Sequence, residues 1–362
     1  MHTKELRIPL QNELNNNANT NNMKNLKINI VLLLAFAFLA ACNNTNQYQT
    51  EQEVYLVPQI DGEWWQVTTY HPDITPYTYG KGDNNVCDFT MFKAKDGTWQ
   101  LIACIRGNDY PGKNRFLYRW ETRNLADTLW EEKGVFQSTG VGNEPDGFGN
   151  VWDPEFYPNM GQLQAPHCVI YEDQYYLFYN NRDAMCKISD DGLNWKDLKT
   201  DDGSYHFFEM GRDLMMFDDT KQSGKWIAYY TTGGAFPQFM EARTSESLKG
   251  QWSKGKMIYD GWSNTRNPIY GNEFAESPFV IHYDDRYYLF AQLHVFISDD
   301  PLDFTDNFKI ADLESSNYHE RVWAPEIIVD EDGQYYIAAY RPKGIFMAKL
   351  KFIETTEPSK YD

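Results

Sequence analysis

The chain has 362 residues, 16% of them aromatic, and carries a formal net charge of −19. This length suits one large domain or two ordinary ones, and many Tyr and Trp without long helix-forming runs favour β-structure. So strong a negative charge argues against a nucleic-acid partner, because phosphates would be repelled, and leaves neutral sugars and small molecules open.

The N-terminal segment has the pattern of a bacterial export signal. Residues 1–22 are polar and rich in Asn, and they fit either an over-extended start before Met23 or a disordered leader. A basic region, an apolar run over 28–39 and small residues before Cys42 follow. The apolar run is too short to span a bilayer, so the pattern predicts a signal peptide. The cysteine at the cleavage point resembles the lipobox of bacterial lipoproteins, which implies that Cys42 is acylated.

The part of the chain after the signal keeps four cysteines, Cys87, Cys104, Cys168 and Cys186. They show no CxxC spacing, which argues against a zinc site. Export would permit disulfides, but each cysteine lies in an apolar strand context. Free buried thiols and disulfides therefore both remain open.

One pattern recurs past residue 80: a small polar or acidic residue, an apolar strand, an Asp/Gly turn, and an aromatic residue in a second strand. Its five copies begin at Asp88, Gln164, Asp213, Glu276 and Trp323, and the aromatic residue follows after 11 to 13 residues in each. Repeats of roughly 45–75 residues with about four short strands are typical of β-propellers. The repeats predict an all-β, five-bladed β-propeller, whose last blade the stretch 54–60 would close as an added strand.

These patterns divide the chain into three parts. Residues 1–42 are expected to be the leader and signal peptide, and residues 43–53, rich in Asn, Thr and Gln, a flexible tether. Residues 54–362 are expected to form a single five-bladed propeller. The protein would then be exported and lipid-anchored, in the periplasm or at the outer membrane and cell surface.

The aligned repeats bring three carboxylates to the axis of the ring. The first residue of each copy begins the innermost strand of its blade, so Asp88, Asp213 and Glu276 should share one register at one end of a central channel. Each acid alone could be a strand cap, an ion-pair partner or a rim charge. Together they repel one another and raise each other's pKa, a cost that favours a functional role. Cleavage of a glycosidic bond requires such a pair, one carboxyl protonated and one ionised.

The order Asp, Asp, Glu over blades one, three and four resembles the five-bladed glycoside hydrolases of family 43 and their relatives in families 32, 68 and 117. The strings Gln164-Ala-Pro-His, Ala275-Glu-Ser-Pro-Phe-Val and Trp323-Ala-Pro-Glu-Ile-Ile resemble the strand starts of that family. Arg212-Asp213 is similar to the pair of the fructan-active relatives. The segment Asn85-Val-Cys-Asp88 departs from the Asp-Pro start of the better-known families and indicates a divergent branch.

The resemblance implies an inverting mechanism. Asp88 would be the general base, Glu276 the general acid, and Asp213 would orient the substrate and adjust pKa values. In the mode of family 32, Asp88 would instead be a nucleophile and the configuration would be retained. A carboxyl separation of roughly 5–5.5 Å favours retention and one of roughly 6.5–9.5 Å inversion.

Other residues around the channel are expected to bind the substrate, a plant or algal oligo- or polysaccharide. They are Gln164, His167, Arg212, Trp323, Glu326 and Arg106. For His167 a neutral histidine hydrogen-bonded in the core is equally open, and Arg106 and Arg341 could contact an acidic sugar or sulfate or be surface charges. Aromatic rim side chains suit stacking on sugar faces; those considered are Trp64, Trp65, Tyr70, Trp152, Trp262 and Trp323.

The resemblance implies that no cofactor is required, although His294 and His319 could serve a structural calcium or a water on the axis. Two other functions remain open. A catalytically silent propeller could bind glycans for a sugar-uptake system, and a structural propeller could serve protein contacts. The structural propeller predicts an uncharged, packed channel and leaves the three acids unexplained.

Overall fold

The computed structural model describes residues 53–74, 85–106, 115–137, 163–181, 183–233, 238–260, 275–292, 294–305, 309–313 and 323–356. Within these ranges the regular structure consists of strands alone. The expected signal peptide, Cys42 and the tether up to residue 52 lie outside the described residues. No helix in the described part of the chain is long and apolar enough to cross a membrane.

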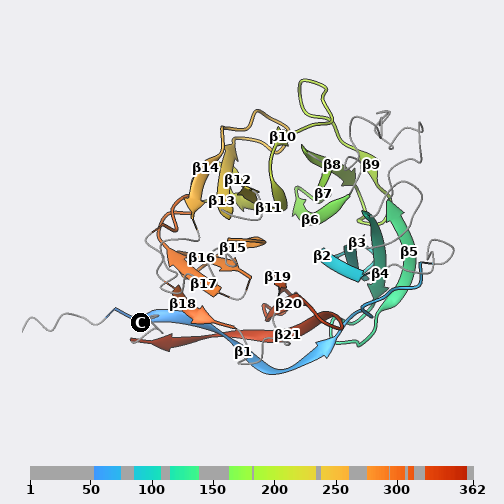
Figure 1. The fold of residues 1–362 in the computed structure, drawn as a ribbon, viewed down its shortest axis with the longest axis horizontal. Helices are drawn as coiled ribbons and strands as arrows, with labels where there is room; N and C mark the ends of the chain where they lie inside the picture. The colour runs from blue at the N-terminus through green and yellow to red at the C-terminus, as the bar shows by residue number, and fades with distance from the viewer. Residues whose placement is uncertain are drawn as a thin grey trace, which may run out of the picture. The chain divides into compact units, whose positions relative to one another are not determined.

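Five antiparallel sheets form a ring, so the predicted five-bladed propeller is confirmed (Figure 1). Blade one contains β2 (Asn85–Lys93), β3 (Trp99–Arg106), β4 (Arg115–Thr122) and β5 (Glu131–Gln137). Blade two contains β6 (Gln164–Tyr171), β7 (Gln174–Asn181) and β8 (Asp183–Ser189), with the short strands β9 (Lys196–Asp197) and β10 (Phe208–Glu209) paired to β8.

The remaining three blades follow in chain order. Blade three contains β11 (Arg212–Asp219), β12 (Lys225–Gly233), β13 (Gln238–Ser245) and β14 (Lys256–Tyr259). Blade four contains β15 (Pro278–Tyr283), β16 (Arg286–Ala291), β17 (His294–Ser298) and β18 (Lys309–Asp312). Blade five contains β19 (Trp323–Val329), β20 (Tyr335–Arg341), β21 (Gly344–Thr355) and the N-terminal strand β1 (Tyr55–Gln66).

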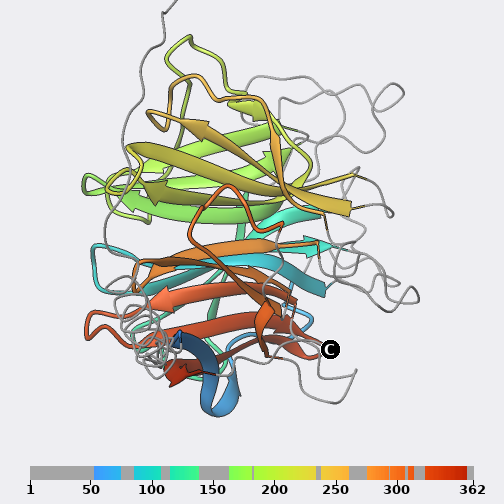
Figure 2. The same cartoon turned by 90° about the vertical axis from the view of Figure 1, so that its left-hand side faces the viewer.

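The first strand of each blade faces the centre of the ring. Strands β2, β6, β11, β15 and β19 contact one another in this order, and β19 returns to β2 (Figure 1). In Figure 2 the strands run across the page, along the direction from which Figure 1 is viewed. The starts of the five inner strands therefore meet at one end of the axis, as the repeat pattern predicts.

The N-terminal strand closes the ring. β1 pairs antiparallel with β21, from Tyr55 opposite Thr355 to Gln66 opposite Phe346. The closing strand is confirmed and is longer than the stretch 54–60. It covers the outer edge of blade five, which would otherwise expose unpaired N–H and C=O groups.

The two tryptophans of β1 pack within blade five. The ring of Trp65 meets the edge of Tyr336 with 6.2 Å between ring centroids, and the guanidinium of Arg341 lies 5.0 Å from the ring of Trp64. Both rings thus have partners in the blade. Contact of Trp64, Trp65 or Arg341 with a sugar stays a prediction.

The hydrophobic core lies between adjacent blades. Its clusters join blade one to blade two, blade two to blade three, blades three to five, and blade five to blade one. Strand β3 is buried at every residue up to Ile105, because both faces of its sheet are covered by neighbouring blades. Trp120 and Trp226 are among the largest fully buried side chains, and each such aromatic contributes roughly 1.5–3 kcal/mol by leaving water.

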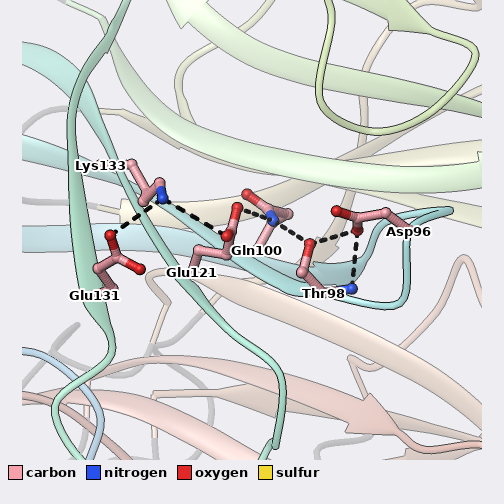
Figure 3. A network of polar contacts seen from close by, with 6 residues as sticks. All are labelled: Asp96, Thr98, Gln100, Glu121, Glu131 and Lys133. Atoms are coloured by element: carbon pink, nitrogen blue, oxygen red, sulfur yellow. Dashed lines mark hydrogen bonds and ion pairs between the residues drawn. The ribbon is translucent and has the colours of Figure 1, made fainter.

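Blade one also contains a chain of polar contacts that crosses its strands (Figure 3). Gln100 is fully buried, and its amide nitrogen donates to Thr98 Oγ1 at 2.7 Å and to Glu121 Oε2 at 3.0 Å. Lys133 links Glu121 to Glu131, with N–O distances of 3.7 and 3.2 Å. Burying an amide group costs free energy unless the group is hydrogen-bonded. These contacts satisfy the amide nitrogen of Gln100, whereas its Oε1 has no hydrogen bond among the described residues.

The four described cysteines are free thiols. Cys87 and Cys104 lie opposite each other on β2 and β3, and their mutual hydrogen bond together with burial raises the pKa of Cys87. Burial also raises the pKa values of Cys168 and Cys186. Of the two alternatives, the structure has free thiols: Cys87, Cys104 and Cys186 are buried, and Cys168 is partly exposed. A raised pKa keeps a thiol in its less reactive protonated form.

Candidate active site

The inner strands begin with a shared backbone irregularity. Ala165, Asp213, Ser277 and Ala324 all have left-handed φ angles, between 47° and 58°. In blades two, three and five the pairing of the inner strand with its neighbour shifts register at this point. Each left-handed residue other than Gly costs about 1 kcal/mol, and strain of this kind gathers at functional sites.

The position of this irregularity shows that the expected register of the three acids was partly wrong. The residue before it is Gln164, Arg212 and Trp323 in blades two, three and five, opposite Asn180, Thr231 and Tyr340. Asp213 therefore corresponds to Ala165 and Ser277, and Glu276 stands one place earlier, where blade three has Arg212. In blade one the register shifts between Cys87 and Phe89, so Asp88 corresponds to Asp213. The single shared register of Asp88, Asp213 and Glu276 was wrong by one residue for Glu276.

The error comes from the turns between the first and second strands. Five residues separate these strands in blades one and three, at 94–98 and 220–224, but only two in blades two and four, at 172–173 and 284–285. The number of residues between the start of the inner strand and the aromatic residue of the second strand therefore differs between blades. Aligning the blades on that aromatic residue consequently misplaces some strand starts. Position along the inner strand is better counted from the left-handed residue.

The three acids nevertheless meet at the axis. A narrow cavity of about 30 Å³ is lined by strand starts of all five blades, including Asp88, Asp213, Ser277 and Glu326. Glu276 directly precedes Ser277 at this end of blade four. The cavity is large enough for one or two water molecules, and polar groups from distant parts of the chain converge on it.

The acids act on one another electrostatically. Burial and the charges of Asp88 and Glu276 raise the pKa of Asp213 well above its usual value, against the opposing charge of Arg212. Burial also raises the pKa of Asp88, partly offset by the positive charges of Arg106 and Arg115. A protonated carboxyl beside an ionised one is the combination that general acid–base chemistry requires.

Arg212 joins two of the acids across blades three and four. Its Nε donates to Glu276 Oε1 at 3.0 Å, and its Nη2 lies 3.0 Å from the same oxygen. Nε is also 3.5 Å from Asp213 Oδ2, a buried atom without a hydrogen bond among the described residues. Gln292 donates to the other oxygen of Glu276 at 3.4 Å. Both oxygens of Glu276 thus face donors, which fixes the orientation of its carboxyl group.

His167 and Glu326 form a pair within the axial packing. His167 is 5% exposed, its Nε2 lies 3.1 Å from Met216 O and its Nδ1 lies 3.5 Å from Glu326 Oε1. Burial raises the pKa of Glu326, while His167 and Thr90 lower it. Glu326 lines the cavity, whereas His167 is hydrogen-bonded in the core, and substrate contact by His167 stays a prediction.

The side of the site between blades one and five holds a network of polar and aromatic side chains. Arg106 Nε donates to Asn85 Oδ1 at 2.8 Å, and its guanidinium lies 5.9 Å from the ring centroid of Tyr340. Asn85 donates to Tyr70 Oη at 2.9 Å, and the hydroxyl of Tyr340 reaches the same oxygen at 3.2 Å. Of the expected rim aromatics, Tyr70 thus lies at the site.

Several residues of the site were not predicted. They are Asn85, Arg115, Thr231, Gln292 and Tyr340. Arg115 donates to Gln164 Oε1, and the Ser277 N–H donates to Thr231 Oγ1 at 3.1 Å. Tyr340 lies on the second strand of blade five and Arg115 on the third strand of blade one. Pairing the strands of each blade one after another, outward from the inner strand, would have shown that both residues lie level with the strand starts.

Trp323 begins β19 at the position equivalent to Glu276 and is partly exposed. Trp152, Trp262 and His319 lie outside the described residues. His294 is buried in blade four, and the described residues contain no group of three or more His, Cys, Asp or Glu that could hold a metal ion.

No protein-family model and no curated protein matches the sequence. Solved structures do match. An exo-1,5-α-L-arabinanase from a bovine ruminal metagenomic library is 14% identical with a TM-score of 0.50, over 75% of this chain and 95% of that one. An α-L-arabinanase mutant from Cellvibrio cellulosa is 16% identical with a TM-score of 0.50, over 75% and 92%. The chain has a glycoside-hydrolase-like fold.

A thermostable family-43 glycoside hydrolase, 18% identical, also matches, with a TM-score of 0.48 over 78% of this chain and 92% of that one. At these identities the likeness concerns the fold, and the chemistry must be argued from the side chains at the axis.

Proposed function

We propose that this protein is a glycoside hydrolase that cleaves plant or algal oligo- or polysaccharides. The observation that carries the proposal is the meeting of Asp88, Asp213 and Glu276 at one end of the axis, with the pKa of Asp213 raised by burial and by the charges of the other two. A fold gains no stability from such a cluster. The chemistry that needs carboxyls in different protonation states around one small space is acid–base cleavage.

In the proposed mechanism Asp88 acts as the general base and Glu276 as the general acid. Asp88 takes a proton from water as the water oxygen attacks the anomeric carbon, and Glu276 gives a proton to the leaving oxygen. Water attacks from the face opposite the leaving group, so the configuration inverts. Asp213 orients the sugar and adjusts the protonation of its neighbours.

Arg212 prepares Glu276 for this role. Its contacts at 3.0 Å restrict the carboxyl group of Glu276 to one orientation before substrate binds. Groups held in position in advance lose little entropy on reaching the transition state. No cofactor takes part in the proposed chemistry.

The proposed location follows from the signal pattern. Acylation of Cys42 would anchor the protein to a membrane, and the Asn/Thr/Gln-rich tether would hold the propeller away from the surface. The substrate is then a glycan outside the cytoplasm. Labelling with a radioactive fatty acid in a bacterial host, for the native chain and for Cys42→Ser, tests the anchor.

Incubation with a panel of plant and algal oligosaccharides tests the function. The proposal predicts that the wild type releases sugar from at least one of them and that Glu276→Gln does not, while Glu276→Gln still binds that glycan in calorimetry. A wild type that binds glycans but releases no sugar from any of them would instead favour a binding protein of a sugar-uptake system.

A further inference from the structure

Two arginines lie directly opposite each other on neighbouring strands of blade one, at the end of the blade where the inner strand begins. Arg106 ends β3, Arg115 begins β4, and the two are partners in the strand register. Like charges at directly opposed positions destabilise a sheet. Among the residues that the structure describes, neither guanidinium forms an ion pair with a carboxylate; Arg106 donates to the amide oxygen of Asn85 and Arg115 to that of Gln164. In the described part of the chain the arginine pair (Arg106 and Arg115) is thus bonded to neutral amides, and the carboxylate on which both charges act is that of Asp88.

The arginine pair lies beside the candidate active site. Asn85, which Arg106 contacts, begins the strand that carries Asp88, and Gln164, which Arg115 contacts, precedes the cavity-lining Ala165. The charges of both arginines act on Asp88. Neither arginine lines the axial cavity itself. The pair adjoins blade five through Tyr340 and blade two through Gln164, close enough to Asp88 to reach a molecule bound there.

The guanidinium of Arg106 is held in place by its neighbours. Asn85 accepts from its Nε, Tyr70 accepts from Asn85, and the ring of Tyr340 lies 5.9 Å from the guanidinium carbon. The side chain has little freedom to lose when a ligand arrives, and both arginines remain partly exposed. An arginine that is preorganised in this way and still accessible suits the binding of a ligand better than a mobile surface arginine does.

Planar guanidinium groups bind carboxylate and sulfate oxygens through paired, charge-assisted hydrogen bonds. We propose that the arginine pair recognises an anionic group, a uronate carboxylate or a sulfate ester, on the sugar residue bound next to Asp88. This inference rests on the proposed function for the position of the sugar. It narrows the substrate class from glycans in general to acidic glycans.

Calorimetric binding to the Glu276→Gln protein at low ionic strength tests the inference. One arm compares oligogalacturonides with the same oligosaccharides after reduction of their carboxyl groups. The other compares sulfated galactan oligosaccharides with their desulfated forms. The acidic member of one arm should bind at least about 10-fold more tightly than its neutral partner, and that arm identifies the anion.

Two further variants assign the preference to the arginine pair. Arg106→Gln and Arg115→Gln should each reduce affinity for the acidic glycan about 10-fold more than affinity for its neutral form. Arg123→Gln, at an exposed position just after β4, is the matched control and should change nothing. Circular dichroism and melting temperature establish that each variant is folded.

The outcomes separate this inference from the proposed function. Equal affinity for the acidic and neutral members of both arms would overturn the inference, even if the wild type cleaves a neutral glycan. An equal loss of affinity for acidic and neutral glycans in the arginine variants would overturn it too. Selective binding of an acidic glycan that the wild type never cleaves would support the recognition site and contradict the hydrolase.

Discussion

The guanidinium of Arg212 contacts Glu276 Oε1 through two of its nitrogens, each at 3.0 Å. The contact joins the first strand of blade three to the start of blade four. The same Nε lies 3.5 Å from Asp213 Oδ2, so one side chain restrains two of the three acids. Arg212 is therefore proposed to be a positioning residue whose geometry matters as much as its charge.

The substitution Arg212→Lys tests whether the geometry of Arg212 matters as well as its charge. A lysine keeps the charge but has one nitrogen, which cannot hold Glu276 from two directions. We expect kcat on a cleaved oligosaccharide to fall about 100-fold with a smaller change in KM. Arg243→Lys, on β13 of the same blade, is the control and should keep wild-type kcat. Unchanged kcat in Arg212→Lys would show that charge alone suffices.

Asp213→Asn should lower activity and raise stability. Because the folded state raises the pKa of Asp213, it binds a proton more tightly than the unfolded chain does. Ionisation of Asp213 therefore costs stability as the pH rises above the unfolded value of about 3.9. The amide removes this cost, and we expect melting temperature at pH 7 to rise by roughly 1–3 °C. The gain should shrink as the pH approaches 4, and a variant less stable than the wild type at pH 7 would contradict the account.

The arginine pair should set the acidic limb of the pH–activity profile. Asp88 must be ionised to act as a base, and the charges of Arg106 and Arg115 lower its pKa against the effect of burial. Removal of one charge in Arg106→Gln raises that pKa, so the acidic limb of kcat/KM should move to higher pH, by up to about one unit. Arg123→Gln should leave the limb in place, and a shift to lower pH in Arg106→Gln would disagree with this role.

The closing strand offers a test of the fold. Val57 of β1 is 8% exposed and packs in the core, whereas Val54, just before the strand, is 53% exposed. Val57→Asp buries an unpaired charge beside β21 and should cost about 3 kcal/mol or more. Val54→Asp is the same substitution at an exposed position and should be nearly neutral. Thermal unfolding compares the two, and equal stability would show that β1 does not hold the ring closed.

The sequence predicts the architecture well because the architecture is repetitive. Five copies of one strand–turn–strand pattern indicate five blades, and the apolar stretch after Val54 indicates the closing strand. The register of Glu276 was wrong because turn length varies between blades while the left-handed residue that fixes the strand start has no fixed identity, being Ala165 in one blade and Asp213 in another. Arg115 and Tyr340 escaped prediction because they reach the site from outer strands, through pairings that the repeat pattern does not specify.

Release of reducing sugar by the wild type and by Glu276→Gln, followed by proton NMR on an oligosaccharide that both proteins bind, tests whether Glu276 is the general acid of a hydrolase. Glu241→Gln, which changes a glutamate bonded to Tyr230 in blade three, is the matched control. We expect a rate lower by about 10²–10⁴-fold in Glu276→Gln and unchanged in Glu241→Gln, with an inverted anomeric signal from the wild type. Equal rates in the wild type and Glu276→Gln would contradict the role of Glu276 as general acid.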